Sequence, residues 1–462
     1  MEGRDLSSRP AQDVAQDREI GVSLTTPQTV QKLQTALHAK AKGSPAFRFY
    51  SLYDKMCRLD VLSHAYACGR ANKGTAGVDG QTFEDIEAQG LQRWLGELAE
   101  ELRNRTYRPQ AVRRVYIPKA NGKLRPLGIP TIRDRVAQMA CVLVLDPIFE
   151  ADMQDEQYAY RSGRSALDAV QKVRRLVANG HEEVVDGDLS GYFDSIPHSE
   201  LMKCVARRVS DGALLSLIKQ WLTAAVEETD ERGHRRRTTG NKDQGRGVPQ
   251  GAPISPLLSN LYMRRFVLGW KALGHEKRLD AHIINYADDF VICCRGTGAQ
   301  AATAMRSMMR RLKLTVNEDK THICRLPEEA FDFLGYTIGR CHSPRTGRAY
   351  LGTVPSKPKV QGLFARLSEL TSRRTLLLDV PVLIGELNRL LVGWANYFSL
   401  GPVSKAYRAV DAHVATRLRR WLCAKHKVAS GGYSRYPDRY LTGQLGLVRL
   451  PLLRRRYPCA KA

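Results

Sequence analysis

Two adjacent carboxylates, Asp288 and Asp289, lie between two short apolar runs at 281–284 and 290–294. Runs of this length and composition are typical of β-strands, so the pattern predicts a hairpin with the two acids at its tip. Carboxylates beside apolar strands are costly unless a positive charge lies against them, and Mg²⁺ prefers hard oxygen ligands of this kind. The segment by itself is compatible with a divalent-metal site and with a solvated turn carrying two acids, and the rest of the chain decides between them.

A second acidic segment begins where the β-branched pair at 184–185 meets Asp186. Asp188 and Asp194 follow, and the aromatic Phe193 comes directly before the last of these acids. An acid at the end of a strand beside an aromatic side chain suits a site for a metal and a nucleotide. Composition does not rank the three acids, and Asp194 has an alternative role as a cap or turn residue.

Two cations flank a predicted hairpin turn. Asn121-Gly122 between two β-like runs is a strong hairpin signal, and it places Lys119 and Arg125 on the two arms near the same tip. Two cations in this position suit a triphosphate, because Arg can bind phosphate oxygens through two parallel hydrogen bonds. A solvated basic hairpin is the alternative.

Three further segments carry candidate residues. A Pro- and Gly-rich loop at 247–256 opens an apolar helix, and its Gln250 offers hydrogen bonds without charge. Lys320 follows a predicted strand that begins near residue 314, and a β element begins at 331–336. Helical patterns are predicted over 29–69, 91–104 and 131–150, over a segment capped by Ser165, and over 358–372, 380–398 and 404–426.

The 462 residues carry a net charge of +25 that is concentrated near the C-terminus. Between Cys341 and Ala462 there are 22 Lys and Arg against five Asp and Glu, a net charge of +17. This excess predicts a polyanionic partner, with nucleic acid favoured over an anionic membrane. The sequence has neither an apolar run of membrane-spanning length nor a signal-peptide core, and its ten cysteines form no Cys-x-x-Cys pair. We therefore expect a protein of the reducing cytoplasm with no membrane partner, no disulfide framework and no cysteine zinc site.

The order of these motifs resembles that of reverse transcriptases, and most closely the reverse transcriptase/maturase encoded by bacterial group II introns. The resemblance covers about residues 70–430. Its most specific parts are 188–194, 247–256, 286–289 and 393–398, the last of which belongs to the helical maturase region of that family. It implies a right-hand polymerase of the α/β (α+β) class, in which fingers and a palm with an antiparallel sheet precede a three-helix thumb.

The resemblance also implies residue roles. Asp188 and Asp288 would hold two Mg²⁺ ions, with Asp289 as the supporting carboxylate and help from the backbone carbonyl of Leu189. Lys320 would lie near the pyrophosphate as a proton donor. Four residues would bind the incoming nucleotide: Lys119 and Arg125 at the triphosphate, Phe193 as the plate that excludes a 2′-hydroxyl, and Gln250 in the pocket wall. Phe333, Leu334 and Gly335 would position the primer end.

The domains implied by the resemblance are a flexible leader (1–26), fingers and palm (27–355, with the family's N-terminal extension motif near 72–80), a thumb/maturase domain (356–430) and a short basic tail (431–462) without an endonuclease. The expected partners are intron RNA as template and splicing substrate, a DNA primer or target, and dNTPs, in a bacterial cytoplasm close to the nucleoid. RNA contacts are expected from Arg161, Arg164, Arg366, Arg373, Arg374, Arg417 and Arg420.

Two other functions remain open at this point. One is an RNA-binding splicing maturase without polymerase activity. The other is a domesticated reverse transcriptase in repair or phage defence. The presence of the three acids, Gln250 and both fingertip cations favours an active polymerase over the first alternative.

Overall fold

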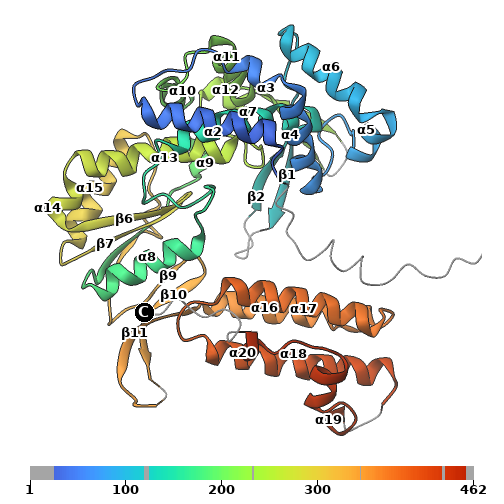
Figure 1. Cartoon of the computed structure of the whole chain (residues 1–462). Helices are drawn as coiled ribbons and strands as arrows, with labels where there is room; N and C mark the ends of the chain where they lie inside the picture. Colours follow the sequence, from blue (N-terminus) through green and yellow to red (C-terminus); the bar gives the residue numbers. More distant parts are fainter. Residues whose placement is uncertain (1–24, 119–123, 231–233, 344, 429–431, 454–462) are drawn as a thin grey trace, which may run out of the picture. The chain divides into compact units, whose positions relative to one another are not determined.

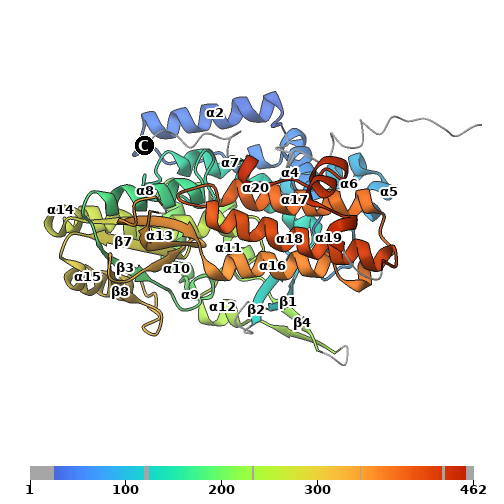
Figure 2. The ribbon, with the colours of Figure 1, turned by 90° about the horizontal axis from the view of Figure 1, so that it is seen from below.

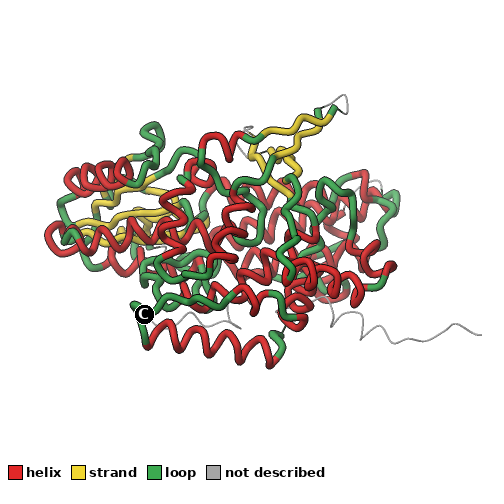
Figure 3. Tube along the Cα trace, turned by 90° about the horizontal axis from the view of Figure 1, so that it is seen from above, coloured by secondary structure: helices red, strands yellow, loops and turns green. Residues whose placement is uncertain are grey.

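The computed structural model describes residues 25–118, 124–230, 234–343, 345–428 and 432–453. These residues form two compact units, each built from two separate stretches of chain. Unit 1 comprises Met1–Gln154 and Gly191–Arg264, and unit 2 comprises Asp155–Ser190 and Arg265–Ala462. Strands in the two units belong to separate sheets (Figure 3). Among the described residues, no helix combines the length and apolarity needed to cross a bilayer.

Unit 1 is mainly helical and contains one four-stranded sheet. Its strands are β1 (Val112–Pro118), β2 (Leu124–Ile129), β4 (Val226–Thr229) and β5 (Arg235–Thr238), in the order β2-β1-β4-β5. Its helices are α2 (Gln28–Gly43), α3 (Tyr53–Met56), α4 (Leu59–Ala71), α5 (Phe83–Gln89), α6 (Leu91–Arg103), α7 (Ile132–Glu150), α9 (Tyr192–Ser195), α10 (His198–Ala206), α11 (Gly212–Leu222) and α12 (Gly240–Gln244). α2 and α4 pack against the apolar α7.

Local signals account for much of unit 1. β1 and β2 pair antiparallel, which confirms the predicted hairpin, while its tip at 119–123 lies outside the described residues. Helices α6 and α7 confirm the predictions over 91–104 and 131–150. The single helical pattern predicted over 29–69 was wrong in one respect, because the chain leaves α2 at Gly43 and re-enters a helix only at Tyr53. Pro45 explains the break, since proline lacks the N–H that a continuing helix needs.

Unit 2 is organised around a four-stranded sheet with the order β6-β7-β3-β8, in which every neighbouring pair is antiparallel. The strands are β3 (Glu183–Gly187), β6 (Ala281–Tyr286), β7 (Asp289–Cys294) and β8 (His322–Arg325). α8 (Ala166–Ala178) packs on one face through Val170 and Val173. α15 (Gly298–Arg311) contacts β3, β7 and β8 (Figure 2). α13 (Ser255–Ala272) contributes its C-terminal residues to this unit, and α14 (His275–Leu279) leads into β6.

Gly187, the last residue of β3, is required by close packing. A Cβ atom at this position would lie 2.3 Å from Cζ of Phe290, its partner on β7. The Phe290 ring is buried and lies edge-on to Phe266 of α13, with ring centroids 5.3 Å apart. The missing side chain of Gly187 therefore lets an aromatic ring fill the sheet face directly beneath the start of the acidic segment.

A second sheet and a helical bundle complete unit 2. The sheet consists of β9 (Phe331–Phe333), β10 (Tyr336–His342) and β11 (Ala349–Pro355). The bundle, seen side by side in Figure 1, consists of α16 (Lys357–Leu370), α17 (Val380–Tyr397), α18 (Ser404–Lys425) and the short elements η1 (Arg373–Thr375), α19 (Gly432–Arg435), η2 (Tyr440–Gln444) and α20 (Leu450–Leu453). The three long helices confirm those predicted from the sequence.

The segment after α18 belongs to this bundle. Leu441, Leu447 and Leu450 are buried in the same apolar core as α17 and α18. The amide of Asn388 donates to the carbonyl of Gly446 at 2.9 Å and accepts from the N–H of Val448 at 3.0 Å. Part of what the sequence predicts as a separate basic tail is thus packed against the helices. All described strand pairs are antiparallel except β1 and β4, which pair in parallel. With these sheets and its helices, the chain has the mixed α/β fold class that was predicted.

Candidate active site

The hairpin formed by β6 and β7 carries Asp288 in its loop and Asp289 at the first position of β7. Tyr286 pairs with Asp289, so the loop consists of Ala287 and Asp288 alone, which confirms the predicted hairpin. Ala287 adopts a positive φ of 58°, which is uncommon for a residue with a side chain. The buried amide of Asn285 holds this turn by donating to the carbonyl of Ala287 at 2.8 Å.

The central sheet brings acids from distant parts of the chain to one end. Gly187 of β3 pairs with Phe290 of β7, and Asp186 pairs with His322 of β8. The described pairing stops there, so Asp188 directly follows the last residue of β3, and Asp289 directly precedes Phe290 on β7. Lys320 lies in the segment before β8, and its ammonium contacts Asp188.

Asp188 is held by several contacts from the segment that precedes β8. Nζ of Lys320 lies 3.2 Å from its Oδ2, and Nδ2 of Asn317 donates to the same oxygen at 2.8 Å. Its backbone N–H donates to Oγ1 of Thr321 at 3.2 Å, and its carbonyl accepts from the N–H of Asn317 at 2.8 Å. These contacts fix both the backbone and the carboxylate.

Leu189 forms an isolated antiparallel bridge with Val316. The hydrogen bonds on that side are made by its neighbours, because Ser190 donates to Thr315 and Asp188 accepts from Asn317. In this arrangement the carbonyl of Leu189 is directed away from Val316. It is thus available as an additional oxygen donor.

Burial and neighbouring charges raise the pKa values of two acids, Asp289 and Asp186. Desolvation of its carboxyl raises the pKa of Asp289 to about 6, although the residue as a whole remains solvent-exposed, and the charges of Asp288, Asp188 and Asp186 add to the effect. Burial followed by the charge of Asp188 raises the pKa of Asp186 to about 6 as well, against the opposing effect of His322. Raised carboxyl pKa values from burial and neighbouring acids are common at functional sites, including those that bind cations.

The donor set fits a hard divalent cation such as Mg²⁺, because it offers carboxylate oxygens and a backbone carbonyl. Asp188, Asp288 and Asp289 do not, however, form a described group with three ligand atoms within 4.8 Å of one another. In the structure Asp188 forms an ion pair with the ammonium of Lys320.

The predicted primer segment forms a second tight turn in unit 2. Leu334 and Gly335 connect β9 to β10 and have φ values of 49° and 81°, the signature of a two-residue hairpin loop with both residues left-handed. The hydroxyl of Tyr397 at the end of α17 donates to the carbonyl of Leu334 at 2.7 Å. Phe333 is the last residue of β9 and is buried.

This turn and Asp289 line the same cleft, which has a volume of about 500 Å³. The bundle supplies the remaining wall: Lys359, Trp394, Tyr397 and Phe398. Nε1 of Trp394 is buried and has no hydrogen-bond acceptor within the part of the chain that the structure describes. The cleft thus combines one carboxylate with a lysine and aromatic side chains.

The candidate nucleotide-binding residues lie in unit 1, where backbone hydrogen bonds connect them. Val248 donates to the carbonyl of Phe193 at 2.8 Å, and Gly128 of β2 donates to the carbonyl of Gln250 at 2.6 Å. Arg125 is exposed on β2, three residues before Gly128. Phe193 is half-buried in α9, beside the ring of Tyr192. Lys119 lies outside the described residues.

The predicted RNA-binding arginines differ in how they are engaged. Arg417 donates to the carbonyls of Ser368 and Thr371 at 2.8 and 3.2 Å and so closes the end of α16. Three others have contacts within the chain: Arg161 with the carbonyl of Gln157, Arg164 with Asp155, and Arg366 with Glu369. The remaining three are exposed and form no ion pair with described residues: Arg373, Arg374 and Arg420.

Several contributors to the site were not predicted. Asn317, Thr321 and Asn285 position the acids, and Tyr397 holds the primer turn. The role of Asn285 could have been predicted from the sequence, since Asn side chains commonly stabilise turns. The role of Asn317 could not, because its contact with Asp188 spans 129 residues of sequence.

Comparison with known proteins identifies the family. Residues 117–338 match the model of the reverse transcriptase (RNA-dependent DNA polymerase) family, and residues 360–440 match the group II intron maturase-specific domain. Protein YkfC of Escherichia coli K12 is 34% identical over 379 residues, which cover 74% of this chain and 96% of that protein. The group II intron-encoded protein LtrA of Lactococcus lactis is 28% identical over 354 residues, which cover 63% of this chain and 57% of LtrA.

Among solved structures, a partial Cas6-RT-Cas1–Cas2 complex matches 56% of this chain and 41% of its own, with 23% identity and a TM-score of 0.35. The two family matches and the relative covered over nearly its whole length confirm the resemblance seen in the motifs. The chain belongs to the family of group II intron-encoded reverse transcriptase/maturases, whose enzyme class is RNA-directed DNA polymerase.

Proposed function

We propose that the protein copies intron RNA into DNA from a DNA primer and binds the same RNA to assist splicing and mobility. The observation that carries this proposal lies at one end of the central sheet, where Lys320 contacts Asp188 and the β6–β7 hairpin carries Asp288 and Asp289. Nucleotide addition requires alignment and charge stabilisation rather than covalent chemistry from the protein, and a group of charged side chains at the end of a sheet can provide both.

Asp188, Asp288 and Asp289, with the carbonyl of Leu189, are the residues that would hold two Mg²⁺ ions. These ions would supply Lewis-acid stabilisation of the attacking and leaving oxygens. Asn317 and Thr321 keep Asp188 oriented for this task. Lys320, already in contact with Asp188, is proposed to neutralise the departing pyrophosphate and to donate a proton to it.

In unit 1 we assign the incoming dNTP to Lys119, Arg125, Phe193 and Gln250. Arg125 supplies charge for the triphosphate, and the ring of Phe193 discriminates against a 2′-hydroxyl. This assignment is supported by the chemistry of the two side chains, since Arg125 carries a permanent positive charge and Phe193 carries a flat aromatic ring. Both lie in unit 1, where backbone hydrogen bonds connect their segments to the loop that contains Gln250.

In unit 2 we assign the primer strand to the cleft beside the turn of Phe333, Leu334 and Gly335. The ammonium of Lys359 suits its phosphates. The exposed arginines of the bundle are proposed to bind intron RNA. On this proposal residues 27–355 act as fingers and palm and 356–430 as thumb and maturase domain, with the segment 432–453 packed against that domain. The protein is proposed to work in the bacterial cytoplasm close to the nucleoid.

The direct test is extension of a DNA primer on an RNA template with Mg²⁺ and dNTPs, comparing the wild type with Asp288→Asn. We expect the substitution to lower extension by at least about a hundredfold, since it removes a metal-binding charge, while RNA binding is retained. Asp243→Asn, at an exposed position of α12, is the control. Undiminished extension by Asp288→Asn would refute the assignment of the acids. A wild type that promotes splicing without incorporating nucleotides would favour a maturase without polymerase activity.

A further inference from the structure

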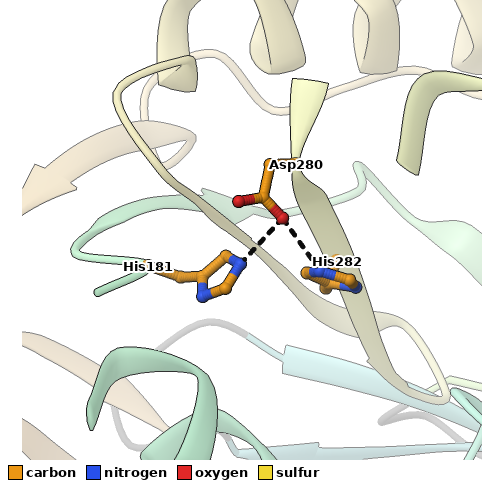
Figure 4. Close-up of side chains that lie close together, drawn as sticks. All are labelled: His181, Asp280 and His282. Carbon is orange, nitrogen blue, oxygen red and sulfur yellow. Dashed lines mark hydrogen bonds and ion pairs between the residues drawn. The ribbon is translucent and has the colours of Figure 1, made fainter. Parts of the chain in front are cut away.

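Two histidines and an aspartate meet at the other end of the central sheet (Figure 4). His181 lies in the turn between α8 and β3, Asp280 ends α14, and His282 is the second residue of β6. Oδ1 of Asp280 lies 3.1 Å from Nε2 of His181 and 3.3 Å from Nε2 of His282. Among the described residues, this is the group in which three potential ligand atoms lie within 4.8 Å of one another.

Both ring nitrogens of each histidine face an oxygen. Nδ1 of His181 lies 3.1 Å from the carbonyl of Leu176, and Nδ1 of His282 lies 3.4 Å from Oε1 of Glu276. A neutral imidazole has one N–H and one lone pair, so neither neutral ring can satisfy both of its oxygen neighbours. A cation that accepts the Nε2 lone pairs would leave Nδ1–H of each ring to face its other oxygen neighbour.

The outer contacts are those of metal-binding histidines. Such residues usually donate the second ring N–H to a backbone carbonyl or a carboxylate, which fixes the tautomer and the ring orientation. Leu176 supplies the carbonyl for His181, and Glu276 supplies the carboxylate for His282. Arg295 lies 3.6 Å from Oδ2 of Asp280, which leaves Oδ1 facing the histidines.

The spacing also suits a tetrahedral ion. Zinc–ligand bonds of about 2.0–2.1 Å place neighbouring ligand atoms roughly 3.3 Å apart, and the two distances to Oδ1 of Asp280 are 3.1 and 3.3 Å. His181 is 6% exposed, so one ligand is shielded from solvent, whereas the side chains of Asp280 and His282 are 48% and 29% exposed. An ion can therefore enter from the solvent side.

We propose that His181, Asp280 and His282 form a site for a divalent transition metal, best matched by Zn²⁺, with water as the fourth ligand. Imidazole nitrogens select such ions over Mg²⁺. β3 and β6 both run antiparallel to β7, so the proposed site lies at their beginnings and the acids lie at their ends. The ion would join the α8–β3 turn to the α14–β6 junction across β7, and so stabilise the sheet that carries the acids.

The test is zinc retention by the full-length protein. The protein is stripped with a chelator and dialysed against micromolar Zn²⁺ with millimolar Mg²⁺, and bound zinc is measured by plasma mass spectrometry. We expect one zinc per chain in the wild type and in Asp288→Asn, and a loss of that zinc in His282→Gln and His181→Gln. Glu276→Gln should keep the stoichiometry but lower the affinity about 10–100-fold. If Asp288→Asn lost its zinc while His282→Gln kept it, the zinc would belong to the catalytic acids and the proposal would be overturned.

A matched control is His234→Gln. His234 lies 3.3 Å from Asp230, but its pair is exposed and is joined by no third ligand in the described structure. Its substitution should leave zinc retention unchanged. Because His181 is buried, His282→Gln is the decisive variant: zinc should raise the Tm of the wild type and not that of this variant. No zinc in the wild type would show that the cluster is only a pair of imidazolium rings around a carboxylate.

Discussion

The ammonium of Lys320 lies 3.2 Å from Oδ2 of Asp188, an acid 132 residues earlier in the chain. Both side chains are partly exposed, so the pair contributes little to stability. Its significance is electrostatic, because it sets a fixed positive charge against a carboxylate that we assign to Mg²⁺. Lys320 and the metal therefore compete for the same oxygen.

Removing this competition should change the Mg²⁺ requirement. In Lys320→Gln we expect half-saturation of primer extension at a Mg²⁺ concentration roughly two- to fivefold lower, the range expected for an exposed ion pair. The maximal rate should fall, because the proposed proton donor is lost. Mg²⁺ titrations under single-turnover conditions separate the two effects. Lys203→Gln, which removes a 3.1 Å pair with Glu200 on α10, should change neither. A higher Mg²⁺ requirement in Lys320→Gln would contradict the competition.

The raised pKa values predict how activity depends on pH. The pKa of Asp289 and that of Asp186 are both about 6, so these carboxyls are ionised above that pH and become neutral below it. Because metal ions bind the ionised form, the Mg²⁺ concentration needed for extension should rise as the pH falls through 6. An ordinary Asp would produce this rise only near pH 4.

Asp186→Asn tests the cause of this shift. The charge of Asp186 is one of those that raise the pKa of Asp289. Its removal should lower that pKa and move the acid limb of the pH–rate profile to lower pH. Asp319→Asn removes an exposed charge from the turn before Lys320 and serves as the control. If both variants kept the wild-type limb, the coupling between Asp186 and Asp289 would be refuted.

Phe193 is predicted to control sugar selectivity. Replacing the ring with a methyl group in Phe193→Ala should reduce the preference for dNTPs over rNTPs by at least about tenfold, since the 2′-hydroxyl is then excluded by no bulky group. The ratio of kcat/KM values for a matched dNTP and rNTP measures this preference. Phe193→Tyr keeps a ring of similar shape and should retain it. Equal selectivity in all three proteins would remove Phe193 from the nucleotide site.

Tyr397 is predicted to act through the primer turn. Its hydroxyl donates to the carbonyl of Leu334, whose φ of 49° makes the turn costly to hold. Tyr397→Phe removes a hydrogen bond worth about 1 kcal/mol. We expect weaker primer binding and shorter products with an unchanged KM for dNTPs. Tyr350→Phe, at an exposed position of β11, should behave like the wild type. A changed dNTP KM with normal primer binding would contradict this role.

The sequence predicts those parts of the molecule that local chemistry determines. The β6–β7 hairpin follows from two apolar runs around four polar residues, and α8 begins at Ser165 because its side chain and that of Asp168 form a capping box. The helices of the bundle follow from apolar residues at helical spacing. Each of these signals lies within about twenty residues of sequence, so no knowledge of the tertiary structure is needed to read them.

Contacts between distant segments could not be predicted in this way. Composition did not rank Asp186 against Asp188, and only the sheet register shows that Asp186 lies beside His322 while Asp188 meets Lys320. The proposed zinc ligands were not predicted from the sequence for the same reason. Cysteine spacing gives no indication of this cluster, because it joins His181 to residues about a hundred positions later without a cysteine.

The exposed arginines of the bundle provide the last prediction. Each Lys or Arg that contacts a phosphate of single-stranded RNA changes the slope of log K against log salt by about 0.7. Combined replacement of Arg373, Arg374 and Arg420 by Gln should therefore flatten the slope for intron RNA by about 2, while Arg93→Gln on the exposed face of α6 should not. Filter binding between 50 and 500 mM salt, roughly the range over which such contacts are screened, measures both slopes.

Arg417→Gln distinguishes a structural arginine from an RNA-binding one, because the guanidinium of Arg417 already donates to carbonyls at the end of α16. We expect this substitution to lower the Tm more than it changes the slope. An unchanged slope in the triple variant would mean that RNA contacts other residues, and it would refute the assignment of these three arginines to RNA binding.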